Sequence, residues 1–336
     1  MKLELNKREL IYPIGSTSFP SVHASTLVFL DEERIAAAWF GGASESNPDV
    51  RIWFSVMTDG RWSAPVAITP DNGIAHWNPT LFNDNGRLIM IYKEGLSPRK
   101  WYSMIIESTD DGQTWTEPRE LVPGDIGGRG PVKDKMIRLS NGELLAPASL
   151  EDESNRWVPF ADISADGGKT WLHSAPISIR RGETVYNSID EMPPKIQGLI
   201  QPTAWEEDGV PGRIHMLMRS SFGYIYHTVS NDFGRTWSTA EPTSLPNNNS
   251  GIDCVKTESG AVVLIYNPVG DNWGSRSPVS LTFSTDNGES WSEPLHVETL
   301  KGEFSYPAII ARGNKLYMTY THRRESIAYA EAELVD

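Results

Sequence analysis

The chain has 336 residues, of which 39% are hydrophobic, and its formal net charge at pH 7 is -14. This length allows a large buried core, while the acidic balance argues against a general binder of nucleic acids or anionic membranes. No stretch approaches the ~20 apolar residues that a membrane-spanning helix needs, and the one cysteine, Cys254, excludes an internal disulfide.

The first ten residues, MKLELNKREL, contain no apolar run of the kind found in signal peptides. Together with the single cysteine, this start predicts a reducing, cytoplasmic setting.

Short segments of β character recur along the chain, while long helical periodicity is absent. Glycine (28), proline (23) and tryptophan (12) are plentiful. Six segments follow turn signals, which predicts an all-β chain of six units. They are ERIAAAWF, GRLIMIYK, GELLAPAS, GRIHMLMR, GAVVLIYN and NKLYMTYT, starting at residues 33, 86, 142, 212, 260 and 314.

The spacing of these segments suits a unit of four strands. The longest gap lies between the third and fourth segments and contains RRGETVYNSIDEMPPKIQG, residues 180–198. A polar, proline-containing insertion of this length predicts a functional rim loop and not a tight turn.

A second repeat combines serine, aspartate, glycine and tryptophan in a fixed order. It occurs as STDDGQTW (108–115), SADGGKTW (164–171), SNDFGRTW (230–237) and STDNGESW (284–291), with a decayed copy, SVMTDGRW, ending at Trp62. The aspartate can accept hydrogen bonds from turn N–H groups, glycine adopts a conformation closed to other residues, and tryptophan packs between sheets. A catalytic or calcium-binding role for the aspartates is the alternative, but recurrence once per unit favours a structural turn.

These sequences resemble Asp-box (BNR) repeats, and with six predicted units the chain is similar to the sialidase, or neuraminidase, superfamily. The resemblance runs from about residue 20 to the C-terminus. It implies a six-bladed β-propeller of four-stranded antiparallel blades with Asp-box turns, formed by residues 1–336 as one domain. The N-terminal ~15 residues are then expected to close the last blade.

The innermost strands of a propeller converge on its central channel, so their first residues share one funnel. Each predicted inner strand begins with a polar or ionisable residue and then turns largely apolar. We therefore expect a binding funnel there, the alternative being a hydrated channel without chemistry. The starts are His23 in HASTL, Asn78 in NPTLF, Lys135 in KMIRL, Gln201 in QPTAW, Asp253 in DCVKT and Tyr306 in YPAII.

A second ring of polar residues comes from the ends of the repeated strands. Several cations around one mouth suit an anionic sugar, since a guanidinium binds a carboxylate through two parallel hydrogen bonds. A solvated rim charge is the alternative for any single arginine. The ring comprises Lys93, Arg219 and Asn267, joined near the same rim by Arg276 and by the pair Arg323 and Arg324.

The acid candidates lie in WFGGASESNPDVRIW, where a strand ends at Gly41 and Gly42 and a loop follows. Sialidases carry an acid/base aspartate on the corresponding loop of the first blade, so the resemblance points to Glu45 or Asp49. Glu45 is slightly preferred, because the loop tip is freer to reach a leaving-group oxygen.

Tyr306 matches the slot in which sialidases place a nucleophilic tyrosine, and Arg276 resembles one of their three carboxylate-binding arginines. Two positions depart from the family pattern. His23 stands where an Arg-Ile-Pro segment is usual, and Gln201 stands where a glutamate activates the tyrosine.

These departures leave the base and the arginine triad to be reassigned. Asp253 or the neutral imidazole of His23 is then the candidate base. Arg219, Arg276 and Arg323 are the candidate triad.

The sequence thus predicts an exo-acting, sialidase-like glycoside hydrolase that releases an acidic sugar without a cofactor or metal. The alternatives are a polysaccharide lyase or hydrolase acting on uronic-acid glycans, and a non-catalytic sugar-binding propeller. Its expected partner is an acidic carbohydrate, not nucleic acid or membrane.

Overall fold

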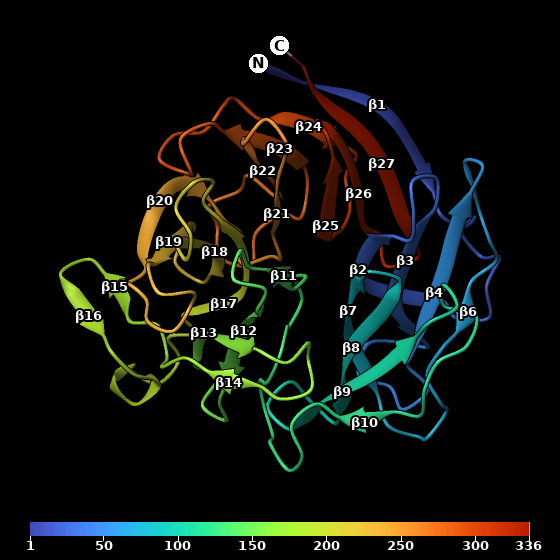
Figure 1. Cartoon of the computed structure of the whole chain (residues 1–336), viewed down its shortest axis with the longest axis horizontal. Helices are drawn as coiled ribbons and strands as arrows, with labels where there is room; N and C mark the ends of the chain where they lie inside the picture. Colours follow the sequence, from blue (N-terminus) through green and yellow to red (C-terminus); the bar gives the residue numbers. More distant parts are fainter. Residues whose placement is uncertain (336) are drawn as a thin grey trace.

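The computed structural model describes residues 1–335, which form six antiparallel sheets around a common centre (Figure 1). Five of these sheets are made of consecutive strands, the first with a short fifth strand, and the sixth combines the last three strands with the N-terminal strand. The predicted all-β, six-bladed propeller is confirmed. Among the described residues, no helix is long and apolar enough to cross a membrane.

The blades follow one another along the chain, with the innermost strand first. Blade 1 contains β2 (Ser21–Phe29), β3 (Ile35–Gly42), β4 (Arg51–Thr58), β5 (Arg61–Trp62) and β6 (Val66–Ala67). Blade 2 contains β7 (His76–Asp84), β8 (Arg87–Gly95), β9 (Trp101–Ser108) and β10 (Arg119–Glu120). Blade 3 contains β11 (Ile137–Arg138), β12 (Leu144–Glu151), β13 (Trp157–Ser164) and β14 (Leu172–His173).

Blades 4 to 6 repeat this arrangement. Blade 4 contains β17 (Leu199–Glu206), β18 (Ile214–Ser220), β19 (Tyr224–Ser230) and β20 (Glu241–Pro246). Blade 5 contains β21 (Asp253–Lys256), β22 (Val262–Tyr266), β23 (Val279–Ser284) and β24 (Leu295–Glu298). Blade 6 contains β25 (Phe304–Arg312), β26 (Lys315–His322) and β27 (Ser326–Val335), and its outer strand is β1 (Lys2–Leu10).

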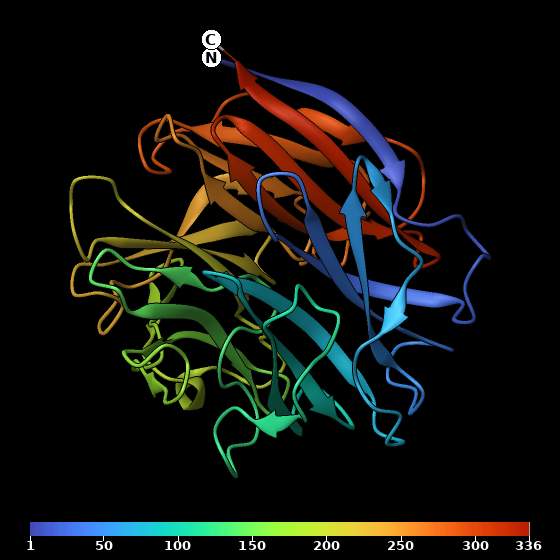
Figure 2. The same ribbon diagram turned by 45° about the vertical axis from the view of Figure 1, so that its right-hand side comes forward.

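The N-terminal strand β1 pairs antiparallel with the C-terminal strand β27, from Lys2 opposite Val335 to Leu10 opposite Ala328. Figure 2 shows the two strands side by side and both chain ends together. The ring is therefore closed by hydrogen bonds between the first and last strands.

The six segments expected as strands form the second strand of each blade. β22, with the sequence VVLIY, is buried at all five positions, because neighbouring blades cover both faces of its sheet. A continuous apolar run is the pattern of a strand buried on both faces.

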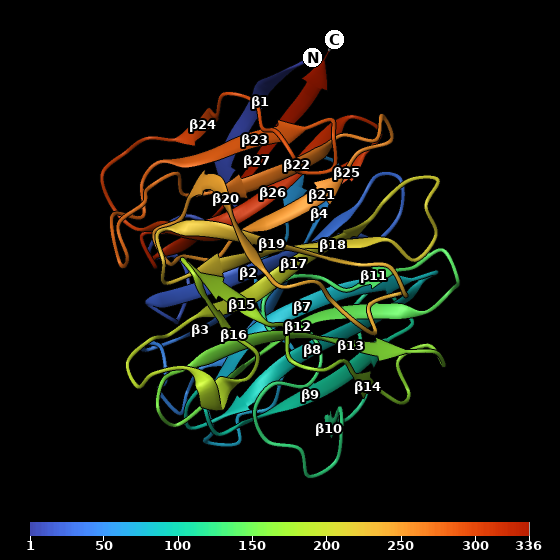
Figure 3. The same ribbon diagram turned by 90° about the vertical axis from the view of Figure 1, so that its left-hand side faces the viewer.

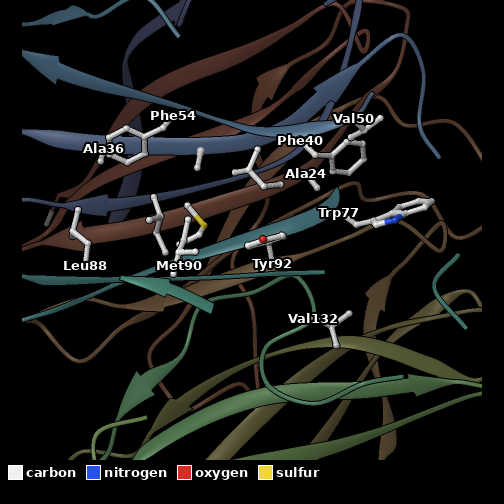
Figure 4. Packing of buried hydrophobic residues seen from close by; sticks show 14 of the residues in the cluster. Ala24, Ala36, Phe40, Val50, Phe54, Trp77, Leu88, Met90, Tyr92 and Val132 are labelled. Atoms are coloured by element: carbon white, nitrogen blue, oxygen red, sulfur yellow. The ribbon is translucent and has the colours of Figure 1, made fainter. Parts of the chain in front are cut away.

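Apolar side chains fill the space between neighbouring blades. Between blades 1 and 2, Phe40 and Phe54 pack with Leu88, Met90 and Tyr92, all at most 2% exposed (Figure 4). Truncating one large side chain of this cluster to alanine typically costs about 2–5 kcal/mol. This packing fixes the angle at which each inner strand meets the centre.

The Asp-box turns join the third strand of a blade to the fourth. In the third box, Asp232 accepts hydrogen bonds from the Thr236 N–H at 2.8 Å and from the Ser230 hydroxyl at 2.8 Å. Gly234 has φ of 84°, and its carbonyl accepts the Trp237 indole N–H at 2.9 Å. The same serine, threonine and tryptophan contacts recur in the boxes of Asp110 and Asp166.

Strand register places these boxes at the end of the blade remote from the first residues of the inner strands. Ser230 lies opposite Ile214, which lies opposite Glu206 at the far end of β17. The hydrogen bonds and this position support the structural interpretation of the box aspartates.

The insertion between blades 3 and 4 contains a small hairpin at the edge of the molecule, seen face-on in Figure 3. It consists of β15 (Ile179–Arg181) and β16 (Thr184–Tyr186), followed by the 3-10 turn η1 (Ile189–Glu191). The segment then runs inward, so that Gln197 reaches the central cavity described next.

Candidate functional site

Four inner strands share a β-bulge near their start. In each, pairing with the second strand is interrupted at a residue in the left-handed region. These residues are Ala24 (φ 54°), Asn78 (31°), Gln201 (53°) and Tyr306 (52°). A bulge re-aims a side chain, and left-handed backbone at non-glycine residues is costly and concentrates at functional sites.

This bulge corrects one sequence prediction. His23 was expected to be equivalent to Asn78, Gln201 and Tyr306, but Ala24 occupies that position in blade 1. The predicted strand start in blade 1 is wrong by one residue, because a bulge inserts a residue that leaves no mark in the hydrophobic pattern.

Asn78, Gln201 and Tyr306 line one cavity of about 320 Å³ at the centre of the ring. This volume lies at the lower end of the range typical of small-molecule sites. All six blades or their connecting loops contribute to it. Its other lining residues are Glu45, Trp77, Pro98, Trp101, Val132, Glu151, Asn155, Trp157, Gln197, Ile200, Arg219 and Trp273.

The Tyr306 hydroxyl is the centre of a hydrogen-bond cluster. It accepts a hydrogen bond from Arg219 Nη1 at 2.6 Å and one from Gln201 Nε2 at 3.3 Å. Burial raises the pKa of the Tyr306 phenol, but the guanidinium groups of Arg219 and Arg276 outweigh burial, and the net direction is downward. The site therefore favours the phenolate more than water does.

Arg219 is the penultimate residue of β18 and is 3% exposed. Its hydrogen-bond partners are uncharged, namely Asn249 Oδ1 at 2.7 Å, Gln201 Oε1 at 2.9 Å and the Tyr306 hydroxyl. Its guanidinium lies 5.5 Å from the ring centres of both Trp157 and Trp273. Burial lowers the pKa of Arg219 from its ordinary value, although an arginine remains charged.

A second cationic cluster lies on the other side of Tyr306. Arg276 lies 5.5 Å from the Tyr306 ring centre and donates to Glu303 Oε1 at 2.6 Å. Arg324 donates to the same oxygen at 2.9 Å and forms an ion pair with Glu45. Burial raises the pKa of Glu303, but the guanidinium groups of Arg276 and Arg324 lower it by more. The net pKa is below the ordinary value, so the carboxylate stays ionised.

Arg324, and not the predicted Arg323, joins this cluster. Arg323 is exposed and donates to the Lys301 carbonyl at 3.4 Å. Both residues have left-handed backbone in the turn after β26, with φ of 54° and 60°. The sequence pair therefore splits, one side chain turning outward and the other towards the site.

His23 packs against the ring of Tyr306, with 4.1 Å between ring centres, and its Nδ1 lies 2.9 Å from Thr321 Oγ1. Burial, followed by the charges of Arg324 and Arg276, holds the pKa of His23 well below its ordinary value. His23 is thus a neutral imidazole on the face of the phenol ring.

Asp253 and Lys135 lie together outside the cavity lining. Lys135 Nζ is 2.8 Å from each carboxylate oxygen of Asp253, which also accepts from the Thr203 hydroxyl and the Ile309 N–H. These four contacts join blades 4, 5 and 6 to the segment that leads into blade 3. The structure does not bring Asp253 into the group around the Tyr306 hydroxyl.

Three more predicted residues support the walls. Lys93 is fully buried, donates to Ser103 Oγ and the Arg129 carbonyl at 2.6 Å each, and burial lowers its pKa to about 7. Asn267 donates to the carbonyl oxygens of Pro278 and Phe304. Asp49 accepts the Ala43 N–H at 3.0 Å and holds the base of the Glu45 loop.

Sequence reasoning missed several lining residues, above all the tryptophans at 77, 101, 157 and 273. None of these tryptophans belongs to an Asp box. A tryptophan outside the boxes was the one feature of the sequence that could have pointed to the cavity. Sequence reasoning also missed Glu151, the last residue of β12, which pairs across the hairpin with Trp157. Burial raises the pKa of Glu151 even though Arg99 Nε lies 3.2 Å away.

The sequence model of the BNR repeat-like domain family matches residues 33–318. An exo-alpha-sialidase of Aspergillus fumigatus is 27% identical over 128 residues, which are 33% of this chain and 29% of the fungal protein. A sialidase of Bacteroides fragilis is 26% identical over 215 residues, covering 57% of this chain and 34% of that protein. The matched regions thus span about a third of the length of these curated relatives.

Two solved structures share the whole fold. The Hadza microbial sialidase Hz136 superposes with a TM-score of 0.79 at 16% identity, over 97% of this chain and 68% of that one. A Dyadobacter fermentans protein of unknown function superposes with a TM-score of 0.77 at 15% identity, over 99% of both chains. At these identities the likeness extends to the propeller fold alone.

Proposed function

Because this chain belongs to the BNR repeat-like domain family, we propose that it is an exo-acting glycoside hydrolase that releases an acidic sugar, sialic acid first, with Tyr306 as nucleophile. The observation that carries the proposal is the Tyr306 hydroxyl, held 2.6 Å from Arg219 Nη1 at the wall of a cavity of about 320 Å³.

The chemistry of sialic acid explains why a tyrosine suits this position. Its anomeric carbon carries a carboxylate, which repels an anionic nucleophile, whereas a tyrosine is neutral as a phenol and becomes anionic only beside the guanidinium groups. Gln201 cannot accept a proton, so ionisation of Tyr306 depends on the guanidinium groups. Arg219 takes this role, because it contacts the phenol oxygen directly and has no anionic hydrogen-bond partner.

Arg276 and Arg324 are the proposed carboxylate ligands of the sugar. Glu303 accepts from both guanidinium groups and fixes their orientation beside Tyr306. A planar guanidinium with remaining N–H donors can then bind a carboxylate in parallel hydrogen bonds. Trp157 and Trp273 provide flat apolar surfaces for the sugar ring, and the cavity suits one terminal residue better than a chain.

The test is the variant Tyr306→Phe, assayed with an aryl sialoside. Loss of the nucleophilic oxygen should slow kcat by about a thousandfold or more, while an unsaturated sialic acid analogue should bind with a nearly unchanged Kd. A mechanism-based fluorosugar of sialic acid should label Tyr306 in the wild type, located by peptide mapping.

Tyr224→Phe is the matched control, since Tyr224 is half exposed and lies outside the cavity lining. It should retain wild-type kcat. Near-normal turnover by Tyr306→Phe, or a label on another residue, would contradict the proposal.

One observation favours a second candidate, a lyase acting on uronic-acid glycans. A tyrosine whose ionised form is held by Arg219, with the neutral His23 on its ring, also suits removal of a proton beside a sugar carboxylate. The ultraviolet absorbance of an unsaturated product would identify this reaction, and a hydrolase would produce none.

A further inference from the structure

The proposed reaction needs a proton donor as well as a nucleophile. When Tyr306 attacks the anomeric carbon, the glycosidic oxygen leaves with a negative charge unless an acid protonates it. In an in-line displacement the leaving group departs from the face opposite the nucleophile. The donor is therefore sought across the cavity from Tyr306.

Two carboxyl groups line the cavity, those of Glu45 and Glu151. Glu45 belongs to the loop of blade 1, next to blade 6, and is joined to Arg324 of blade 6 by an ion pair. Its side chain is 41% exposed. Glu45 thus lies on the nucleophile's side of the ring, and protonating it would break the pair with Arg324.

Glu151 occupies the opposite side. It ends β12 of blade 3, and in a ring of six blades, blade 3 faces blade 6, which carries Tyr306. Its side chain is 13% exposed, and its one ion-pair partner, Arg99, is partly solvated at 39%. A sugar in the cavity would lie between the Tyr306 hydroxyl and this carboxyl.

Trp157 provides a second feature beside Glu151. Its ring lines the cavity, and its indole N–H faces the Glu151 carboxylate, an interaction that lowers the pKa of Glu151 by less than burial raises it. The indole thus holds the Glu151 carboxyl at the cavity wall.

We propose that Glu151 is the general acid of this site and that Glu45 is a positioning residue for Arg324. The assignment rests on the proposed function. A bond forms between the Tyr306 phenolate oxygen and the anomeric carbon, the glycosidic C–O bond breaks, and the Glu151 proton passes to the leaving oxygen. Water then cleaves the glycosyl-tyrosine bond and returns a proton to Glu151, which restores both groups.

The electrostatics agree with this geometry. Burial raises the pKa of Glu151, so its proton is kept to higher pH, while the arginines lower the pKa of Tyr306. Two titratable groups in one cavity, pushed in opposite directions, are typical of an acid and nucleophile pair.

The experiment compares Glu151→Gln with Glu45→Gln on two substrates, a 4-nitrophenyl sialoside and sialyllactose. The nitrophenolate leaves without protonation, whereas the sugar alkoxide does not. Glu151→Gln should lose about 100-fold or more in kcat/KM on sialyllactose and less than about tenfold on the aryl sialoside. The alkaline limb of the pH profile on sialyllactose should also disappear.

Glu45→Gln should instead raise KM for both substrates by the same factor, because the side chain of Arg324 loses its ion pair with Glu45. If Glu151→Gln lost the same factor in kcat/KM on both substrates, or if Glu45→Gln showed the leaving-group dependence instead, the assignment of Glu151 as the acid would be wrong. The proposed function would still stand. Absence of turnover by the wild type would overturn the proposed function and this assignment together. Thermal unfolding of each variant checks that both comparisons use folded protein.

Discussion

At the level of single residues, the ionisation of Tyr306 is governed by its two hydrogen-bond donors, Gln201 and Arg219. An uncharged amide lies 3.3 Å from the phenol oxygen, where a carboxylate would act as a proton acceptor. The direct neighbour that favours ionisation is the Arg219 guanidinium. The site therefore stabilises the phenolate by positive charge and not by a neighbouring base.

Gln201→Glu tests this arrangement. A carboxylate at this position repels the phenolate and competes for Arg219 Nη1, so the pKa of Tyr306 should rise, and ionisation should require a higher pH. The phenolate absorbance that is lost in Tyr306→Phe reports this titration in both backgrounds. An unchanged or lowered pKa in the Gln201→Glu protein would contradict the account.

Several site residues were predictable one by one, and others depended on backbone detail. Tyr306, Gln201 and Asn78 each precede a largely apolar stretch of an inner strand, and this change from polar to apolar places them at the centre. Arg323 and Arg324 are adjacent and chemically identical, and only the left-handed turn decides which side chain faces the site. Glu151 ends the second strand of blade 3, where the sequence resembles an ordinary solvent-exposed glutamate.

At the level of elements, the inner-strand bulge and the Asp-box turn perform separate tasks at opposite ends of a blade. The bulge aims residues into the cavity, and the box fixes the turn after the third strand. Box residues are local in sequence and were therefore predictable. The bulge depends on pairing with another strand, which the sequence does not show. The prediction therefore put His23 at the position that Ala24 occupies.

Blade 3 departs from the others in a way that the sequence did not reveal. Its inner strand β11 is only two residues long and begins at Ile137, after Lys135. Lys135 was expected to start a regular strand and face the funnel. Instead, the ammonium group of Lys135 lies between the blades, where it donates hydrogen bonds to the buried carboxylate of Asp253.

Asp232→Ala measures what one box contributes. The change removes the acceptor for the Ser230 hydroxyl and for the Thr236 N–H and hydroxyl groups. Stability should fall by about 1–3 kcal/mol in chemical denaturation. Turnover by the folded protein should be unchanged, because the box lies at the far end of blade 4.

Asp71→Ala, at an exposed aspartate outside any box, serves as the control and should unfold like the wild type. A loss of turnover in Asp232→Ala at unchanged stability would show that the box acts on the site.

At the scale of the whole molecule, ring closure depends on β1. Without it, β27 presents an unpaired edge of backbone N–H and C=O groups. Leu3 and Leu10 also pack on the core of blades 5 and 6. The ring therefore depends on the first strand for both hydrogen bonding and burial.

Deletion of residues 1–10 should lower Tm and cause association that increases with protein concentration, because the free edge can pair with another chain. Calorimetry and size-exclusion chromatography measure the two effects. Lys2→Ala, which removes only the exposed ion pair with Glu4, should change stability by less than about 0.5 kcal/mol. A truncated chain with unchanged Tm would show that closure is dispensable.

The seam between β1 and β27 also sets the order of events during protein synthesis. β1 leaves the ribosome before the other strands of the ring, yet its partner begins at Ser326. At roughly 5–20 residues per second, β1 waits on the order of 15–60 s for β27. Five of the nine residues in KLELNKREL are charged, a composition that discourages premature edge-to-edge pairing. The charges of β1 thus protect a nascent chain whose last blade can be completed only after every other strand of the ring has been made.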